Sequence, residues 1–129
     1  MGKDKEKIAS WIREWFPLEF DHVFIAYLPN RNKKGRPIKI GTWEKKALQL
    51  QAGMFGGATS YPASGSYRRR SGKGIILEGT KLVTSFVMDK DLTEQALKEV
   101  TDFLKEFGKK TDQETVAFVL DGEMYWIEI

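Results

Sequence analysis

The chain has 129 residues, a formal net charge of +3 and no cysteine. A chain of this length can bury the core of one domain, and the lack of cysteine excludes disulfides, thiol nucleophiles and thiolate metal sites. The charge excess is smaller than that of an obligate nucleic-acid binder, and no apolar run has the length of a membrane span. We therefore expect a cytoplasmic protein with no membrane partner.

Residues 1–17 predict an amphipathic helix that ends at Pro17. Its apolar residues recur at steps of three and four, which places them on one face: Ile8, Trp11, Ile12, Trp15 and Phe16. Tryptophans on such a face suit a partner or a membrane surface, but we expect the helix to pack on the protein's own sheet.

The next two elements are a strand and a helix. Residues 22–28 are apolar and rich in branched and aromatic side chains, which predicts a central strand. Thr42 is a suitable cap for a helix that begins at Trp43. Gly56 or Gly57 supplies the left-handed residue that commonly ends a helix.

The following segment predicts two strands. Pro62 lacks a backbone donor, so its strand is expected at a sheet edge or at a bulge. Residues 82–88 form a strongly apolar strand, with a kink expected at Gly79. A helix follows, with Asp91 and Glu94 as a capping box and Gly108 as its end.

Two last strands, 115–120 and 123–129, are joined by the Asp121-Gly122 hairpin turn. The predicted order therefore contains βαββαβ, the split βαβ pattern of a ferredoxin-like plait in the α+β class. We assign this core to residues 21–129 of one domain, 1–129, with the helix in 1–17 and the final strand as additions.

The glycine pair Gly56-Gly57 resembles a phosphate loop only in composition. A phosphate loop follows a strand and opens a helix, so that free N–H groups and the positive end of the helix dipole meet the anion. Here the pair follows a helix and precedes a strand. A helix stop is the better interpretation.

A basic turn follows the small residues of that strand. Tyrosines beside arginines suit stacked bases and phosphates, or a small anionic ligand. The candidate ligand-binding residues are Thr59, Tyr61, Tyr67, Arg68, Arg69 and Arg70. The third strand lacks the aromatics of an RNA-recognition sheet. The simplest alternative is a solvated loop that protects an edge strand.

Catalytic residues are scarce. The only histidine, His22, is interpreted as structural, and one histidine makes a poor metal site. Glu78 lies among apolar residues, so burial would raise its pKa and make it a candidate general base. The simpler interpretation is an outward-facing glutamate paired with Arg68 or Lys81.

The order FGGAT…P…G…Y…G…E…LV, from Phe55 to Val83, precedes a capped helix and a strand. It resembles a group of small uncharacterised bacterial proteins with an FGGAT signature in a ferredoxin-like plait. Similar plaits often dimerise through their sheets, which implies a homodimer. The resemblance names no reaction; it singles out Gly56, Gly57, Thr59, Tyr67 and Glu78.

Three functions remain open from the sequence. The first is a binding module for a small anionic ligand or a protein partner beside residues 56–70. The second is a nucleic-acid-binding or nuclease-type protein that uses Arg68–Arg70, and the third is a small enzyme with Glu78 as general base. We expect no metal and no organic cofactor in any of the three.

Overall fold

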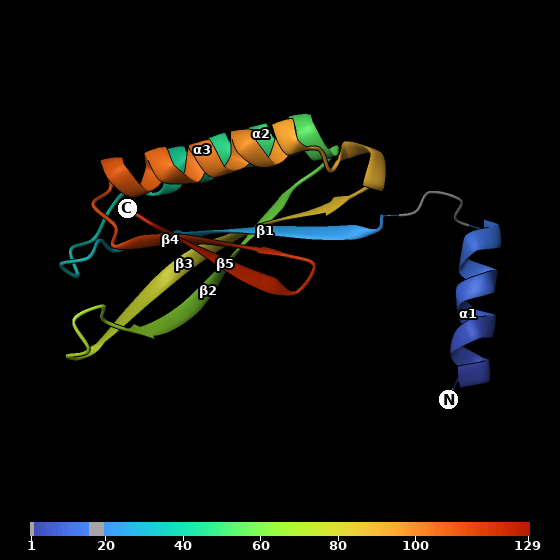
Figure 1. The fold of residues 1–129 in the computed structure, drawn as a ribbon, viewed down its shortest axis with the longest axis horizontal. Helices are drawn as coiled ribbons and strands as arrows, with labels where there is room; N and C mark the ends of the chain where they lie inside the picture. The colour runs from blue at the N-terminus through green and yellow to red at the C-terminus, as the bar shows by residue number, and fades with distance from the viewer. Residues whose placement is uncertain (1, 16–19) are drawn as a thin grey trace.

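The computed structural model of the chain describes residues 2–15 and 20–129. In chain order its elements are α1 (Gly2–Trp15), β1 (His22–Pro29), α2 (Gly41–Phe55), β2 (Thr59–Arg68), β3 (Ile75–Val87), the short 3-10 helix η1 (Asp89–Asp91), α3 (Glu94–Lys110), β4 (Thr115–Leu120) and β5 (Glu123–Glu128). The strands form one antiparallel sheet in the order β2-β3-β1-β4-β5 (Figure 1).

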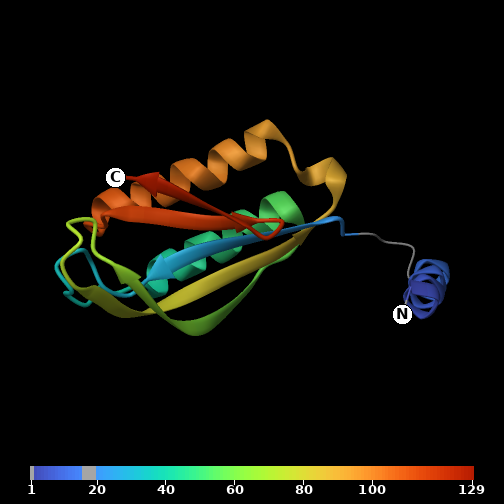
Figure 2. The same ribbon diagram turned by 60° about the horizontal axis from the view of Figure 1, so that its bottom comes forward.

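This architecture confirms the α+β, ferredoxin-like prediction. The apolar strand β1 lies at the centre of the sheet, and β2, which contains Pro62, lies at an edge. β5 extends the plait at the opposite edge, as a hairpin with β4. The helices α2 and α3 cover the same face, and no helix of the described residues lies on the other face of the sheet (Figures 1 and 2).

The core lies between α2, α3 and the covered face of the sheet. Its largest fully buried apolar side chains are Phe24, Phe55, Phe107, Leu28 and Leu104. Trp43 of α2 packs edge-on against Phe107 of α3, with the ring centroids 5.4 Å apart. These contacts fix both helices against the covered face of the sheet.

The start of α2 differs from the prediction. The helix begins at Gly41, and its cap residue Ile40 makes no side-chain capping bond, so Thr42 is not the cap. The end agrees with the prediction, because Gly56 has φ +93° and its N–H donates to the Ala52 carbonyl oxygen. The glycine pair is thus a helix stop.

Both predicted limits of α3 are wrong. Asp91 belongs to the turn η1, and Thr93 caps the helix by accepting a hydrogen bond from the Ala96 N–H at 3.1 Å. Gly108 lies inside the helix, where a Cβ atom would come within 2.7 Å of side-chain atoms of Ile129 and Val116. The glycine is therefore there to allow close packing between helix and sheet.

The helix α1 forms, but it does not pack on the sheet. Its apolar residues Ile8, Trp11, Ile12 and Trp15 are between 45% and 66% exposed, and none of its residues is buried. Both views draw it apart from the sheet (Figures 1 and 2). The expected packing is thus wrong; Phe16 and Pro17 lie outside the described residues. In the part of the chain that the structure describes, no helix is long and apolar enough to cross a membrane.

Candidate functional site

A pocket of about 370 Å³ lies on the uncovered face of the sheet. Tyr67 of β2 and Trp126 of β5 both line it, and their rings meet edge-on with centroids 6.3 Å apart. These strands are opposite edges of the sheet. The sheet must therefore curl so strongly that its two edges approach each other over β3, β1 and β4, which makes the uncovered face concave.

Small residues make room for this pocket. Ala63 and Gly65 of β2 and Ala117 of β4 line it with almost no side chain. A Cβ atom at Gly65 would lie 4.0 Å from the Glu78 carbonyl oxygen, which is ordinary contact. The small-residue run of β2 therefore leaves space for a ligand close to the backbone.

Glu78 of β3 is the acidic side chain of the pocket wall. Burial raises its pKa to about 7, and the positive charge of Arg31 opposes this shift. Its Oε2 atom is buried and has no hydrogen-bond partner among the described residues. The outward-facing alternative is not observed, because Lys81 pairs with Glu44 at 3.9 Å and Arg68 faces Ile75 across the hairpin.

Thr80 lies two residues further along β3 and lines the same pocket. It is only 9% exposed, and its Oγ1 atom also has no partner in the described chain. Buried polar atoms are nearly always hydrogen-bonded, so two such orphans on one wall indicate a site for a polar group. Side chains two residues apart on a strand point to the same face, so the sequence places Thr80 beside Glu78. Only the fold reveals that both lack hydrogen-bond partners among the described residues.

Aromatic rings surround these polar atoms. Burial raises the pKa of Tyr67 to about 12, with help from the negative charges of Glu78 and Glu114. Tyr67 therefore remains a neutral hydroxyl group at neutral pH. Tyr27 and Trp126 also line the pocket, although neither was among the predicted site residues. They lie on strands far apart in the chain, so no local pattern links them to Glu78.

Of the six candidate ligand-binding residues, only Tyr67 lines this pocket. Thr59 lines a separate shallow hollow, beside the Gly56-Gly57 pair and Phe86. Tyr61 is exposed, and its hydroxyl oxygen accepts a hydrogen bond from Thr84 at 3.4 Å. The structure therefore brings together only Tyr67 and Glu78 from the predicted set.

The arginine run joins two loops at one end of the pocket. Arg68 is exposed at the end of β2. Arg69 donates to the Lys33 carbonyl oxygen at 3.0 Å, and Arg70 donates to the Glu114 carbonyl oxygen at 2.6 Å. The two basic segments of the sequence, 31–39 and 68–73, therefore meet in space.

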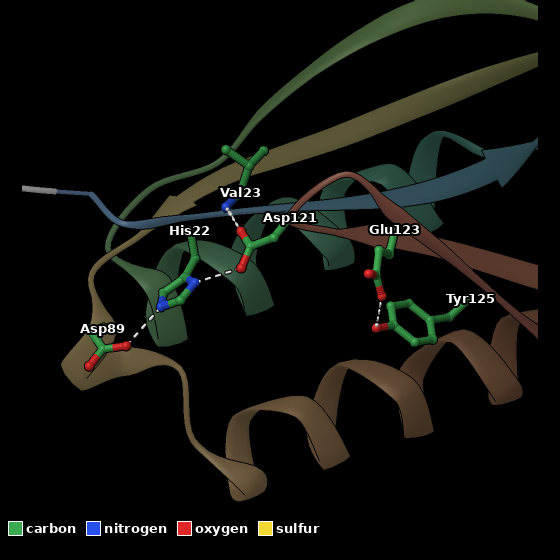
Figure 3. A network of polar contacts seen from close by, with 6 residues as sticks. All are labelled: His22, Val23, Asp89, Asp121, Glu123 and Tyr125. Atoms are coloured by element: carbon green, nitrogen blue, oxygen red, sulfur yellow. Dashed lines mark hydrogen bonds and ion pairs between the residues drawn. The ribbon is translucent and has the colours of Figure 1, made fainter.

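His22 lies at the start of β1 and is clamped between two carboxylates (Figure 3). Its ring nitrogens lie 2.6 Å from Asp121 and 2.8 Å from Asp89, and Asp121 also accepts the Val23 N–H. The hydrogen bonds to Asp89 and Asp121 raise the pKa of His22. This network ties β1 to η1 and to the β4–β5 turn. Within the described residues, no group of three His, Cys, Asp or Glu side chains is arranged to hold a metal ion.

No protein-family model and no curated protein matches the sequence. Two solved structures do match the fold. A phage SAM lyase in complex with S-methyl-5'-thioadenosine aligns with a TM-score of 0.65 and 14% identity, over 84% of this chain and 89% of that one. The apo state of a phage SAM lyase aligns with a TM-score of 0.60 and 15% identity over the same shares. At this identity the likeness shows a shared fold.

Proposed function

We propose that this chain binds S-adenosylmethionine (SAM) in the pocket of the uncovered sheet face and cleaves it. The observation that carries the proposal is the pocket itself, where aromatic rings surround a half-buried carboxylic acid and a buried hydroxyl group. The fold shared with a phage SAM lyase that binds S-methyl-5'-thioadenosine supports this choice of ligand.

The aromatic residues of the pocket suit both ends of an adenosyl sulfonium. Adenine stacks on aromatic rings, and a sulfonium cation is attracted to their faces. Tyr27, Tyr67 and Trp126 supply such rings. The carboxyl group of Glu78 makes a cation a better ligand for this wall than the small anion expected from the sequence.

The two orphan polar atoms suit the ribose hydroxyls or the amino group of the ligand. Oε2 of Glu78 accepts a hydrogen bond, and the Thr80 hydroxyl group both donates and accepts. A buried polar atom without a partner costs about 1–3 kcal/mol. Hydrogen bonds from a ligand would remove this cost, which favours the bound state.

The proposed reaction breaks a carbon–sulfur bond without water. A carboxylate oxygen of SAM attacks its own γ-carbon, the electron pair of the broken bond stays on sulfur, and the products are a five-membered lactone and S-methyl-5'-thioadenosine. No proton is transferred in this step. Intramolecular reactions of this kind reach effective molarities of about 10⁵ M or more when the geometry is held. Glu78 and Thr80 would then act by holding the ligand.

The general-base role of Glu78 remains the competing mechanism. A base would remove a proton from the β-carbon of the amino-acid chain, so that elimination releases the same thioether and an unsaturated amino acid. That carbon carries an unactivated proton, and a carboxylate with a pKa of about 7 is a weak base for it. The lactone route is therefore preferred, and the identity of the co-product separates the two.

The test is to incubate the purified protein with SAM and to identify the products by chromatography and mass spectrometry. We expect S-methyl-5'-thioadenosine with the lactone. A Glu78→Gln variant that folds normally is expected to lose about 10²-fold in rate. The matched control is Glu99→Gln, on the exposed side of α3. Intact SAM, together with no calorimetric binding of SAM or of the thioether, would refute the proposal.

The homodimer through the sheet remains a prediction, and the pocket makes it testable. A partner that covered the uncovered face would also cover Trp126, which is 54% exposed. Light scattering after size-exclusion chromatography measures the oligomeric state with and without ligand. A monomer at working concentrations would contradict the dimer and leave the pocket unaffected.

A further inference from the structure

Three arginines lie in loops that directly follow strands lining the pocket, although none of them lines it itself. Arg31 comes two residues after Pro29, which lines the pocket, and Arg69 comes two residues after Tyr67, which lines it too. Arg70 follows directly. We call these three residues, Arg31, Arg69 and Arg70, the arginine rim.

Main-chain carbonyl groups hold every member of the arginine rim in place. The donors and acceptors are Arg31 Nη1 to Gly35 at 2.9 Å, Arg69 Nη1 to Lys33 at 3.0 Å, and Arg70 Nη2 to Glu114 at 2.6 Å. A carbonyl oxygen is a neutral acceptor. These bonds therefore fix the guanidinium groups without cancelling their charges.

The arginine rim also lacks acidic partners in the described part of the chain. None of its guanidinium groups forms an ion pair with a carboxylate there. Of the acids nearby, Asp112 pairs with Lys33 at 3.1 Å, and the Glu114 carboxylate accepts the Arg70 backbone N–H at 3.4 Å. Three guanidinium groups that are held in place and form no direct ion pair with the described residues make a suitable site for an anion.

The charge of the arginine rim reaches the pocket wall. Arg31 acts against the upward shift in the pKa of Glu78, and Arg69 acts in the same way on Tyr67. Because Arg31 and Arg69 act on side chains of one pocket, their charges gather at one end of it. A nucleic-acid surface instead spreads its charges along a groove or a face.

We propose that the arginine rim binds the carboxylate of the ligand's amino-acid chain and so selects SAM-like ligands over adenosyl thioethers that lack this chain. The inference rests on the proposed function and names the part of the ligand that the rim recognises. A guanidinium that holds one carboxylate oxygen leaves the second oxygen available for attack on the γ-carbon. The rim residues would therefore be positioning residues for the lactone route.

The test uses two thioethers that the proposed reaction does not consume. S-adenosylhomocysteine carries the amino-acid chain, and S-methyl-5'-thioadenosine does not. Isothermal titration calorimetry of the wild-type protein is expected to show about tenfold tighter binding of S-adenosylhomocysteine. Arg31→Gln and Arg69→Gln are each expected to abolish most of this preference and to leave the binding of S-methyl-5'-thioadenosine unchanged.

Arg68→Gln is the matched control, because Arg68 belongs to the same run but not to the arginine rim. It is expected to bind both thioethers as the wild type does. A second measurement on the wild type avoids any folding defect of the variants. Raising the salt concentration from about 0.05 M to 0.5 M is expected to weaken the binding of S-adenosylhomocysteine and not that of S-methyl-5'-thioadenosine.

The outcomes separate this inference from the proposed function. If the wild type binds both thioethers equally, or if the arginine variants weaken both alike, the carboxylate site is refuted and the proposed function stands. If the wild type binds neither thioether nor SAM, the carboxylate site and the proposed function are both refuted. If the variants lose low-salt binding of single-stranded DNA, measured by fluorescence anisotropy, and keep the preference between thioethers, the rim is a nucleic-acid surface and the inference is overturned.

Discussion

The core beneath α2 and the pocket on the uncovered face treat buried polar groups in opposite ways. On the helix-covered face, the buried amide of Gln51 donates to the Val83 carbonyl oxygen and to the Ser85 hydroxyl group, both at 3.0 Å. On the concave face, Glu78 and Thr80 have buried oxygen atoms with no partner in the described chain. The polar groups beneath α2 are thus satisfied within the chain, whereas the concave face is built to receive a polar group from outside.

This difference assigns folding stability to the covered face of the sheet and ligand binding to the concave face. The covered face binds the helices through tightly packed apolar side chains, and the buried amide of Gln51 finds its partners within the chain. The concave face keeps a destabilising carboxyl group, which is typical of sites where a ligand supplies the missing interactions. Variants on the two faces are therefore expected to differ in kind, and four predictions test the comparison.

The largest effect is expected from truncating a core ring on the covered face. Phe107 is fully buried against Trp43. Phe107→Ala is expected to lower the free energy of unfolding by about 3–5 kcal/mol, measured by urea denaturation. The matched variant on the concave face, Trp126→Ala, is expected to cost about 1 kcal/mol, since its ring is half exposed. Equal losses would show that the concave face is part of the structural core.

The second effect compares buried polar groups. Gln51→Met removes both hydrogen bonds of the amide and is expected to cost about 1–3 kcal/mol. Thr80→Val removes a hydroxyl group that has no partner, so we expect it to be neutral or slightly stabilising. Thermal and urea unfolding measure both variants. A clear loss in Thr80→Val would mean that this hydroxyl is already satisfied.

The third effect is a gain of stability at high pH when Glu78 is replaced by glutamine. Its pKa is raised from 4.5 to about 7, so the folded chain keeps a proton that the unfolded chain releases, and stability falls as the pH rises between these values. Glu78→Gln removes this fall. It is expected to be more stable than the wild type by about 1 kcal/mol at about pH 8, once partial exposure is allowed for, and equal to it at about pH 4. A parallel pH profile for both proteins contradicts this expectation.

The smallest effect is expected at His22, whose polar partners are satisfied. Its raised pKa means that its contribution is fully present below 6.5 and is lost as the pH rises through the folded-state value. The lowered pKa of Asp121 adds stability that is lost as the pH falls below the usual carboxyl range. His22→Gln is therefore expected to lower Tm at about pH 6 more than at about pH 9. An equal loss at both values would show that charge plays no part.

Local patterns predicted most of the fold because each depends on neighbours in the chain. The stop at Gly56 follows from its freedom to adopt positive φ. Both residues of the Asp121-Gly122 turn have positive φ, as a two-residue hairpin requires. The error at the C-terminal end of α3 arose where tertiary contacts decide. Gly108 resembles a helix stop in sequence, yet its hydrogen atom is needed to pack against Val116 and Ile129.

The candidate site was predicted only in part, for the same reason. Glu78 and Tyr67 were identifiable as unusual residue types on adjacent strands of one hairpin. Tyr27 and Trp126 were not, because the contact between Tyr67 and Trp126 joins opposite edges of the sheet.

The sequence by itself determined the order of strands and helices and the ferredoxin-like topology, because hydrophobic periodicity, glycines and prolines act over short distances along the chain. It also marked Glu78 as an acid among apolar residues. Only the tertiary structure decided that the uncovered face is concave, that Glu78 and Thr80 lack partners there, and that Arg31 joins Arg69 and Arg70 beside them. These properties depend on sheet curvature and on contacts between distant segments, which no local pattern encodes.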